Sequence, residues 1–411
     1  MKNLNALVAR WRSRAVAWIS KSQGNPTLIA ISAEGFLTRL GFSMVGFVLP
    51  LYALSLGMSL SEVGFLYALR TATVFLVKPV MGWLADRWGR KRTLIAAVVL
   101  RCLMGLLFVF AFLPWHLYLL RVLHGAMTAA RDPSAAALIA EHGNKQNMAS
   151  AFAGYSTARD LGRSLGFGVA GLLLHYTGSY RCVFFISFLT SCAALVTVFR
   201  YVRESNEVAV SASSRARTRD ASARPSYQAL LPYAGFALLI SISAEMMLGL
   251  FPVIATRFGH MTEAEAGLAA SFSTIAILIA GPLFGWLSDH VSRKLVLGIR
   301  SFANTISSLL YILLPSFGGF VVARLVDDTG KAAFKPTWGA IMADVSNADP
   351  ARRASKITFI DSAYALGELV APLIAGFLLS GFGLAAMLGV RAVLAVLTEM
   401  QSVQLFRKPS L

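Results

Sequence analysis

Residues 82–92, GWLADRWGRKR, return 203 positions later as residues 285–295, GWLSDHVSRKL. Both copies keep a Gly-Trp-Leu run, an aspartate two positions after it and an Arg-Lys pair. Matches outside this loop, at the same or a similar offset, are Arg121 with Arg324, Pro133 with Pro336 and Gly162 with Gly367. A loop and separate segments that repeat together predict two homologous halves, residues 28–200 and 229–406.

Long apolar runs fill both halves. The chain has 411 residues, of which 56% are hydrophobic and 14% are charged, whereas soluble domains carry about 25% charged residues. Each run supplies the ~20 residues that a helix needs to cross ~30 Å of hydrocarbon. The runs lie at 28–54, 61–84, 93–113, 116–141, 149–175, 181–200, 229–255, 264–288, 295–314, 317–343, 357–379 and 382–406. The sequence therefore predicts an all-α integral membrane protein whose twelve transmembrane helices form two bundles of six.

The segments that separate these runs are alternately rich and poor in basic residues. Seven segments contain 23 Lys and Arg residues, and the six segments that alternate with them contain only Arg181 and Arg257. Because Lys and Arg collect on the cytoplasmic side of a membrane, this split places both termini in the cytoplasm. The same asymmetry explains the formal net charge of +18 without a nucleic-acid partner, since the basic loops are short and contain no interleaved aromatic residues.

Two segments lie outside the predicted helices. Residues 1–27 form a basic N-terminal segment, within which residues 5–20 can make an amphipathic helix on the inner leaflet. Residues 201–228 are rich in Ser, Ala and Arg and have little to bury, which predicts a flexible cytoplasmic linker. Parallel six-helix repeats are a transporter architecture, with the substrate site near the membrane midplane between the halves.

The sequence provides few groups for metal or cofactor chemistry. Cys102, Cys182 and Cys192 fall inside predicted spans, and the six histidines are scattered without metal-ligand spacing. No P-loop, Rossmann glycine fingerprint, HExxH or GxSxG sequence is present. We therefore expect no cofactor, no metal site, no enzymatic activity and no ATP-driven transport by this chain alone.

The repeated loop carries a family resemblance. Residues 82–92 closely resemble the signature loop of the major facilitator superfamily, and the weaker copy at 285–295 follows the eighth predicted helix, as in that family. Arg121, Gly125 and Ala129 are similar to the second motif of the family. The resemblance is to the branch of twelve-helix drug/proton antiporters. It implies a monomeric secondary transporter of the cell (inner) membrane that works by alternating access.

The resemblance also implies that the two loops form a conformational gate. The predicted gating residues are Gly82, Asp86, Arg87, Gly89, Arg90 and Lys91 in the first copy, and Gly285, Asp289, Arg293 and Lys294 in the second. Glycines allow helices and a tight turn to approach closely, an aspartate accepts bonds from helix N-terminal amides, and the cations pair with acids or lipid phosphates. The alternative, a loop that is basic only because of membrane topology, explains the cations but not the repeated aspartate and glycines.

Many charged residues lie inside the predicted spans, where they are costly and usually face a cavity or a partner. The predicted substrate and proton pathway comprises Glu34, Arg39, Arg121, Arg131, Asp132, Arg163, Glu245, Asp328, Lys331, Asp361 and Glu368. Arg70, Lys78, Arg159 and Asp327 are further charges within spans. The alternative for about half of these residues is a set of salt bridges between helices, for example Lys78 with Asp361.

Acids and bases of this set suggest different roles. A carboxyl group in a low-dielectric cavity can take up and release protons near neutral pH. The predicted proton carriers are Glu34, Asp132, Glu245 and Glu368. Glu245 is favoured because it is the only charge in its helix. The cations that favour an anionic or zwitterionic substrate are Arg39, Arg131, Arg163 and Lys331.

The fifth predicted helix bears on the direction of transport. Gly162, Gly166, Phe167, Ala170 and Gly171 resemble the glycine-proline motif of exporters in the family, with Phe167 in place of the proline. The same spacing of small residues also serves plain helix packing. We expect proton-coupled export of small amphipathic or anionic molecules. The alternatives are an uptake symporter for an organic anion or zwitterion, and a non-transporting sensor.

Overall fold

The computed structural model describes residues 26–142, 148–202, 228–347 and 353–407. Helices cover all twelve predicted spans in these residues, and no strand occurs among them. The first half contains α2 (Pro26–Ser55), α3 (Leu60–Trp88), α4 (Arg90–Val109), α5 (Pro114–His142), α6 (Met148–Thr177) and α7 (Tyr180–Tyr201). The second half contains η2 (Gln228–Leu230), α9 (Leu231–Glu245), α10 (Phe251–Arg257), α11 (Glu263–His290), α12 (Arg293–Leu313), α13 (Phe317–Asn347), α14 (Arg353–Gly381) and α15 (Gly383–Arg407). The predicted segments 1–27 and 201–228 lie almost entirely outside the described residues.

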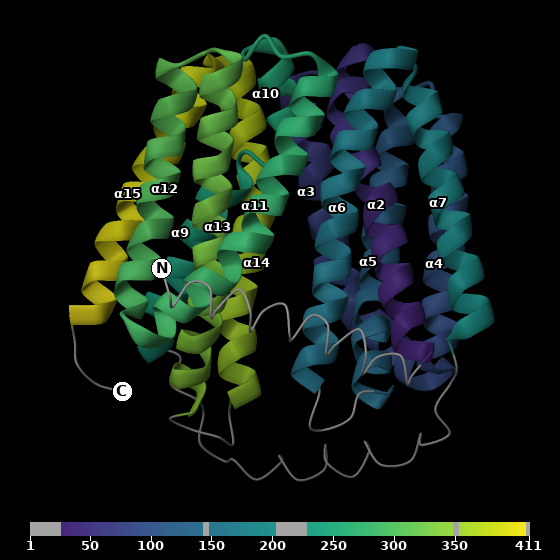
Figure 1. Cartoon of the computed structure of the whole chain (residues 1–411), viewed down its shortest axis with the longest axis horizontal. Coiled ribbons are helices and arrows are strands. Elements are labelled where there is room, and N and C mark those ends of the chain that lie inside the picture. The colour runs from purple at the N-terminus through teal and green to yellow at the C-terminus, as the bar shows by residue number, and fades with distance from the viewer. Residues whose placement is uncertain (1–25, 143–147, 203–227, 348–352, 408–411) are drawn as a thin grey trace, which may run out of the picture.

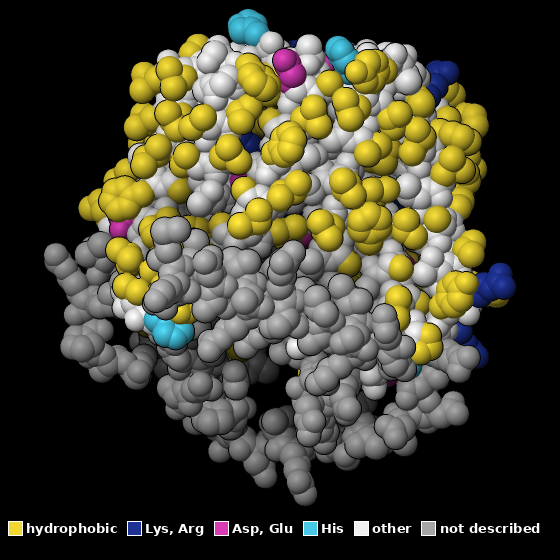
Figure 2. All heavy atoms as spheres, viewed as in Figure 1, with side chains coloured by type: hydrophobic (Ala, Val, Ile, Leu, Met, Phe, Trp, Pro, Cys, Tyr) yellow, Lys and Arg dark blue, Asp and Glu magenta, His cyan; other side chains and the backbone are white. Residues whose placement is uncertain are grey.

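The outside of the helices is hydrophobic. In the coloured part of the face in Figure 2, apolar side chains are spread widely and charged side chains lie mainly near its margins. Eight of the described helices are long and apolar enough to cross a membrane, namely α2, α3, α4, α7, α11, α12, α14 and α15. The prediction of an all-helical membrane protein is confirmed. The number of crossings and the cytoplasmic position of both termini stay predictions.

Two bundles make up the molecule. Figure 1 shows α2 to α7 on one side and α9 to α15 on the other. The main contacts between the bundles join α3 to α14 and α6 to α11. These two pairs are equivalent, because the repeat aligns α3 with α11 and α6 with α14.

The repeat extends to the start of the paired helices. Ser59 caps α3 by accepting a hydrogen bond from the Glu62 amide, while the Glu62 carboxylate accepts one from the Ser59 amide. Thr262 and Glu265, at the same 203-residue offset, form the same capping box at the start of α11. Reciprocal bonds of this kind satisfy amides that have no partner inside the helix, so they fix where each helix begins.

Two pairs of glycines close one end of the molecule, where α3 and α11 begin. A Cβ added to Gly64 would overlap the Pro372 carbonyl oxygen and lie 3.2 Å from Cα of Gly376. At the equivalent contact, a Cβ added to Gly171 would lie 2.9 Å from Cα of Gly267. Only glycine allows the backbones to come this close. The halves are therefore sealed here by direct backbone contact.

The opposite end, where the gating loops lie, is open. Phe75 and Gly82 follow Gly64 by 11 and 18 positions, so they lie on the same face of α3 as Gly64, because a helix turns once every 3.6 residues. Phe75 on that face is 58% exposed, and a Cβ at Gly82 would meet nothing within 4 Å. With the predicted orientation of the chain, the open end is cytoplasmic. The close approach predicted for Gly82 is thus absent from this structure, which is inward-open if the predicted orientation holds.

Gly64→Val is expected to weaken the seal and move the protein toward an outward-open state, since the new side chain collides with the Pro372 carbonyl. The reporter is a cysteine at Ser61, whose hydroxyl donates to the Gly376 carbonyl at 3.4 Å, in a background without the native cysteines. We expect faster labelling by an impermeant maleimide added outside. Gly389→Val is the matched control, because a Cβ at Gly389 meets nothing within 4 Å. Equal labelling of the two variants would contradict the seal.

The seventh predicted span, residues 229–255, is wrong as a single helix. Helix α9 ends at Glu245, residues 246–250 form turns, and α10 begins at Phe251. Pro252 explains the interruption, because it lies in the first turn of α10, has no amide hydrogen to donate and suits a helix start. The break places Glu245 at a helix end rather than midway along a helix.

Candidate functional site

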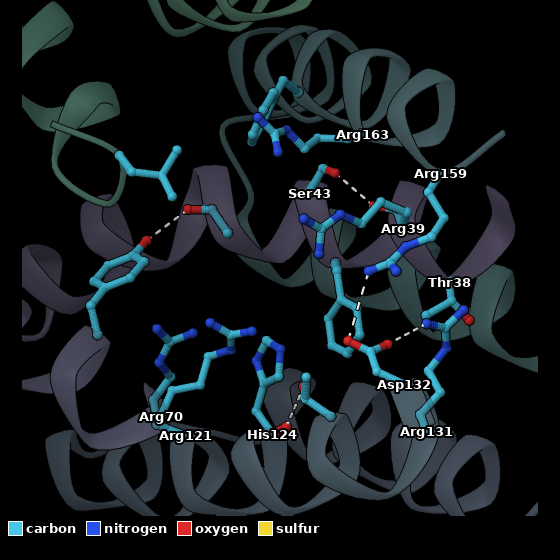
Figure 3. Close-up of a pocket in the computed structure, with 16 residues that line it drawn as sticks. Thr38, Arg39, Ser43, Arg70, Arg121, His124, Arg131, Asp132, Arg159 and Arg163 are labelled. Atoms are coloured by element: carbon cyan, nitrogen blue, oxygen red, sulfur yellow. Dashed lines mark hydrogen bonds and ion pairs between the residues drawn. The ribbon is translucent and has the colours of Figure 1, made fainter. Parts of the chain in front are cut away.

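A cavity of about 170 Å³ lies in the first half, among α2, α3, α5 and α6. Figure 3 shows its polar side chains turned toward a common space. Its lining residues are Thr38, Arg39, Phe42, Ser43, Gly46, Tyr67, Arg70, Arg121, His124, Thr128, Arg131, Asp132, Arg159, Arg163, Phe167 and Leu248. Leu248 comes from the break between α9 and α10, so the second half contributes to the wall.

Helix α6 is held against α2 by small residues, and this packing positions two of the arginines. A Cβ added to Gly162 would lie 3.2 Å from the Leu40 amide nitrogen of α2. The neighbouring residues Arg39 and Arg163 therefore lie where both helices border the cavity. The glycine sequence of the fifth predicted helix thus serves packing within the first half, and through Gly171 it also serves the seal to α11.

Two acids neutralise two of the six lining arginines. The Arg131 guanidinium donates to both carboxylate oxygens of Glu34, at 2.8 and 2.6 Å, and to Asp132 at 2.7 Å. Thr38 donates to Glu34 at 2.7 Å, and Arg159 lies 3.8 Å from Asp132. Glu34 is fully buried, so its charge is committed to holding α2 against α5. This arrangement supports the salt-bridge alternative for Glu34, which was predicted to carry a proton.

The other four arginines, which are Arg39, Arg70, Arg121 and Arg163, have no carboxylate within 4 Å in the part of the chain that the structure describes. Arg121 donates to the Leu66 carbonyl at 2.9 Å and lies over the Tyr67 ring, 4.4 Å from its centroid. Nε of Arg70, Nη2 of Arg121 and Nε of Arg163 are buried with no hydrogen-bond partner among the described residues. The cavity therefore holds an excess of positive charge and free donors.

A further arginine lies behind the wall. Arg101 of α4 is 1% exposed, and its guanidinium lies over the Phe42 ring, 3.6 Å from the centroid. Phe42 in turn stacks on His124, with ring centroids 4.2 Å apart and planes at 3°. Arg101 is not among the predicted pathway residues, although an arginine within an apolar run was the available signal. Its buried charge adds to the positive potential of the cavity.

Charges in the second half form a compact network around Asp327. Its carboxylate contacts Arg391 at 2.5 Å, Lys331 at 2.8 Å and Arg300 at 3.5 Å, and Asp327 is fully buried. Asp328 pairs with Arg324 at 3.0 Å and with Lys331 at 2.9 Å. Asp328 and Lys331, predicted for the pathway, thus belong to an ion-pair network. Asp327 was not in the predicted pathway set, and neither were Arg300 and Arg391.

Two glutamates make no ion pair with that network. Glu245, at the end of α9, and Glu368, on α14, lie within electrostatic reach of each other. Neither has an ion-pair partner within 4 Å among the described residues. Glu245 is attracted most by Lys331 and next by Arg163, and Glu368 is attracted most by Arg70. These glutamates of the second half therefore act electrostatically on two cavity arginines of the first.

The gating loops are only partly described. Gly89 has φ +94°, a conformation that favours glycine, and it joins α3 to α4. Arg90 forms an ion pair with Glu141 at the end of α5, and the Arg87 guanidinium lies 5.2 Å from the Trp83 ring centroid. The side chains of Asp86, Asp289, Arg293 and Lys294 lie outside what the structure describes. The conformational gate between the halves stays a prediction for these residues and for Gly82, Lys91 and Gly285 as well.

Asp361, the last of the predicted pathway residues, is exposed near the open end of α14. It lies within electrostatic reach of Lys78 on α3. These helices belong to different halves, so the attraction acts across the interface, although no ion pair within 4 Å joins the two side chains in the described residues.

Comparisons with known proteins all point to one family. The model of the Major Facilitator Superfamily matches residues 35–259 and 234–406. Multidrug resistance protein MdtG of Proteus mirabilis is 25% identical over 386 residues, covering 91% of this chain and 94% of that protein. A multi-drug resistance efflux pump PmrA homologue of Lactococcus lactis is 26% identical and covers 84% and 86%. A probable 4-methylmuconolactone transporter of Cupriavidus pinatubonensis is 26% identical and covers 71% and 69%.

Solved structures agree on the fold. A bacterial homologue of the human lysosomal transporter Spinster, inward-facing and occupied, superimposes with a TM-score of 0.77 at 15% identity and covers 93% of this chain and 98% of its own. The nucleoside transporter NupG gives a TM-score of 0.72 at 13% identity, covering 92% and 100%. With the repeat, the two bundles and the family match together, this chain belongs to the Major Facilitator Superfamily, a family of membrane transporters and not of enzymes.

Proposed function

We propose that this protein transports small organic anions by alternating access and couples their movement to protons. The observation that carries the proposal is the set of four cavity arginines, Arg39, Arg70, Arg121 and Arg163, that have no carboxylate within 4 Å among the described residues. A cation and an anion about 4 Å apart attract by about 4 kcal/mol at an effective dielectric constant of about 20. A bound anion would therefore stabilise this site, whereas a cationic molecule would be repelled from it.

The cavity can also accommodate the apolar part of a substrate. Phe42, Tyr67, Phe167 and Leu248 line it together with the arginines. Apolar and aromatic walls with a few placed polar groups are the usual make-up of a small-molecule site. The molecule that fits this lining is amphipathic, with an anionic group and a hydrophobic part.

Glu245 and Glu368 are the proposed proton carriers. The groups around Glu245 are Lys331, Arg163, Arg300, Asp327 and Tyr364, and those around Glu368 are Glu245, Arg70, Lys78 and Tyr364. A deprotonated glutamate partly offsets the positive charge of the arginine within its electrostatic reach, and protonation removes that negative charge. Proton uptake by the glutamates therefore favours the binding of an anion to Arg70 and Arg163.

The sign of this coupling between protonation and anion binding determines whether the anion moves with the proton or against it. Because protonation and anion binding favour one another, the two are carried together, and the geometry supports symport best. Export by exchange with protons is the second candidate, favoured by the relatives named as multidrug resistance proteins and by the glycine sequence of α6. Exchange requires the proton and the anion to exclude one another, which is the opposite linkage.

Transport in proteoliposomes separates the candidates. Benzenesulfonate is a suitable probe, because it stays anionic at all working pH values and does not cross lipid unaided. With the membrane potential clamped, symport of one proton is expected to concentrate it about tenfold on the alkaline side for each unit of pH difference. Accumulation on the acidic side would identify exchange instead. Equal levels on both sides would contradict proton coupling, and transport of tetraphenylphosphonium alone would contradict the anion preference.

A further inference from the structure

We infer that the transported molecule is a small organic dianion, with one negative group at each end of an apolar body. This inference rests on the proposed function and names its substrate class. The first support is the number of charges. Six arginines line the cavity, and Glu34 and Asp132 engage only Arg131 and Arg159. A monoanion would leave most of the remaining positive charge without a counter-ion.

The second support is the placement of the free arginines. Figure 3 shows Arg70 and Arg121 side by side near His124, and Arg39 and Arg163 on the opposite side of the cavity. The first pair comes from α3 and α5, and the second pair comes from α2 and α6. The four charges are thus divided between two walls. An anionic group that binds to one pair leaves the charge of the other pair without a counter-ion.

The third support is the supply of hydrogen-bond donors. The first wall offers Nε of Arg70 and Nη2 of Arg121, and the second offers Nε of Arg163, all buried and without a partner among the described residues. A buried donor left without a partner costs free energy, so each wall is prepared for an acceptor. Guanidinium groups match the oxygens of a carboxylate, sulfonate or phosphate in a fixed fork geometry.

The space between the walls determines what joins the two anionic groups. Phe42, Tyr67 and Phe167 line the cavity beside the arginines, and Phe42 is held in place by stacking on His124. An aromatic ring or a short hydrocarbon chain fits such a lining, because its flat apolar surface packs against other rings. The ligand class is therefore an aromatic or short-chain molecule with two terminal anionic groups.

The test compares two probes that differ by one charge. Labelled benzenesulfonate is exchanged across proteoliposomes, and unlabelled 1,4-benzenedisulfonate or benzenesulfonate competes with it. We expect the disulfonate to inhibit at a concentration about tenfold lower or more. Arg70→Gln and Arg163→Gln, which each remove one of the two charges of a wall, are expected to lower this ratio toward one, while Arg70→Lys keeps it close to the wild-type value. Arg181→Gln, on the outer surface, is the control and keeps the wild-type ratio.

The outcomes separate the inference from the proposed function. Equal inhibition by the two sulfonates in the wild-type protein would overturn the dianion and leave anion transport standing. A wild-type ratio that persists in both glutamine variants would overturn the two-wall arrangement. Failure of the wild-type protein to move benzenesulfonate at all, with transport of tetraphenylphosphonium, would overturn the proposed function and this inference with it.

Discussion

Asp327→Asn is expected to destabilise the folded protein by about 3–5 kcal/mol, which is the usual effect of removing one partner from a buried ion pair. The Asp327 carboxylate is fully buried and is the shared partner of Arg300, Lys331 and Arg391. Asparagine keeps the shape but removes the negative charge, so three cations are left with less compensation, two of them fully buried. Thermal unfolding of the purified protein in detergent measures the effect as a lower Tm.

Two further variants test this explanation. Asp361→Asn removes an exposed carboxylate from the same half and is expected to leave the Tm unchanged. Arg391→Gln added to Asp327→Asn removes the closest cation and keeps donors for the Ser243 carbonyl and the nearby hydroxyls, so it is expected to recover part of the loss. An unchanged Tm for Asp327→Asn would show that the network does not depend on this carboxylate.

Glu368→Gln is expected to abolish proton-driven accumulation while exchange of anion for anion continues. Glutamine resembles the protonated carboxyl group but cannot release a proton, so Arg70 stays available to the anion at every pH. In proteoliposomes, the pH gradient would then drive accumulation about tenfold less per unit of pH for each proton lost. Affinity for benzenesulfonate, which we expect to rise in the wild-type protein as the pH falls, would become less dependent on pH.

The matched control for this prediction is Glu62→Gln. That glutamate is exposed in the first turn of α3 and bonds to Ser59 rather than to the cavity. It is expected to retain gradient-driven accumulation. Normal accumulation by Glu368→Gln would exclude Glu368 as a carrier, and the same experiment on Glu245→Gln would then decide whether one glutamate suffices.

Much of the fold followed from local patterns. The 203-residue repeat predicted two halves, and the apolar runs matched the helices to within a few residues. The break after Glu245 was missed, although Pro252 supplied the signal, because apolar residues continue on both sides of Glu245 within the run from 229 to 255. The capping boxes at Ser59 and Thr262 were also present in the sequence and mark the helix starts directly.

Sequence was less informative about the site. Charge inside a span identified Arg39 and Arg163 as cavity residues, but it could not separate them from Glu34, which lies in a buried ion pair. That distinction depends on how each helix is rotated against its neighbours. The contact between Asp327 and Arg391 joins residues 64 positions apart, on helices that are not consecutive, so no local spacing reveals it.

The glycine contacts at the closed end also determine how far the opposite end moves when the conformation changes. Gly64 and Gly82 are 18 residues apart on one helix, which places the gating loop about 27 Å from the seal. Glycines have no side chains to interlock, so the paired helices can pivot at this point. A rotation of about 10° there moves the loop by about 5 Å over that length of helix. The seal is thus a pivot as well as a barrier. A small rotation of the helices at one end of the molecule produces a large separation at the other.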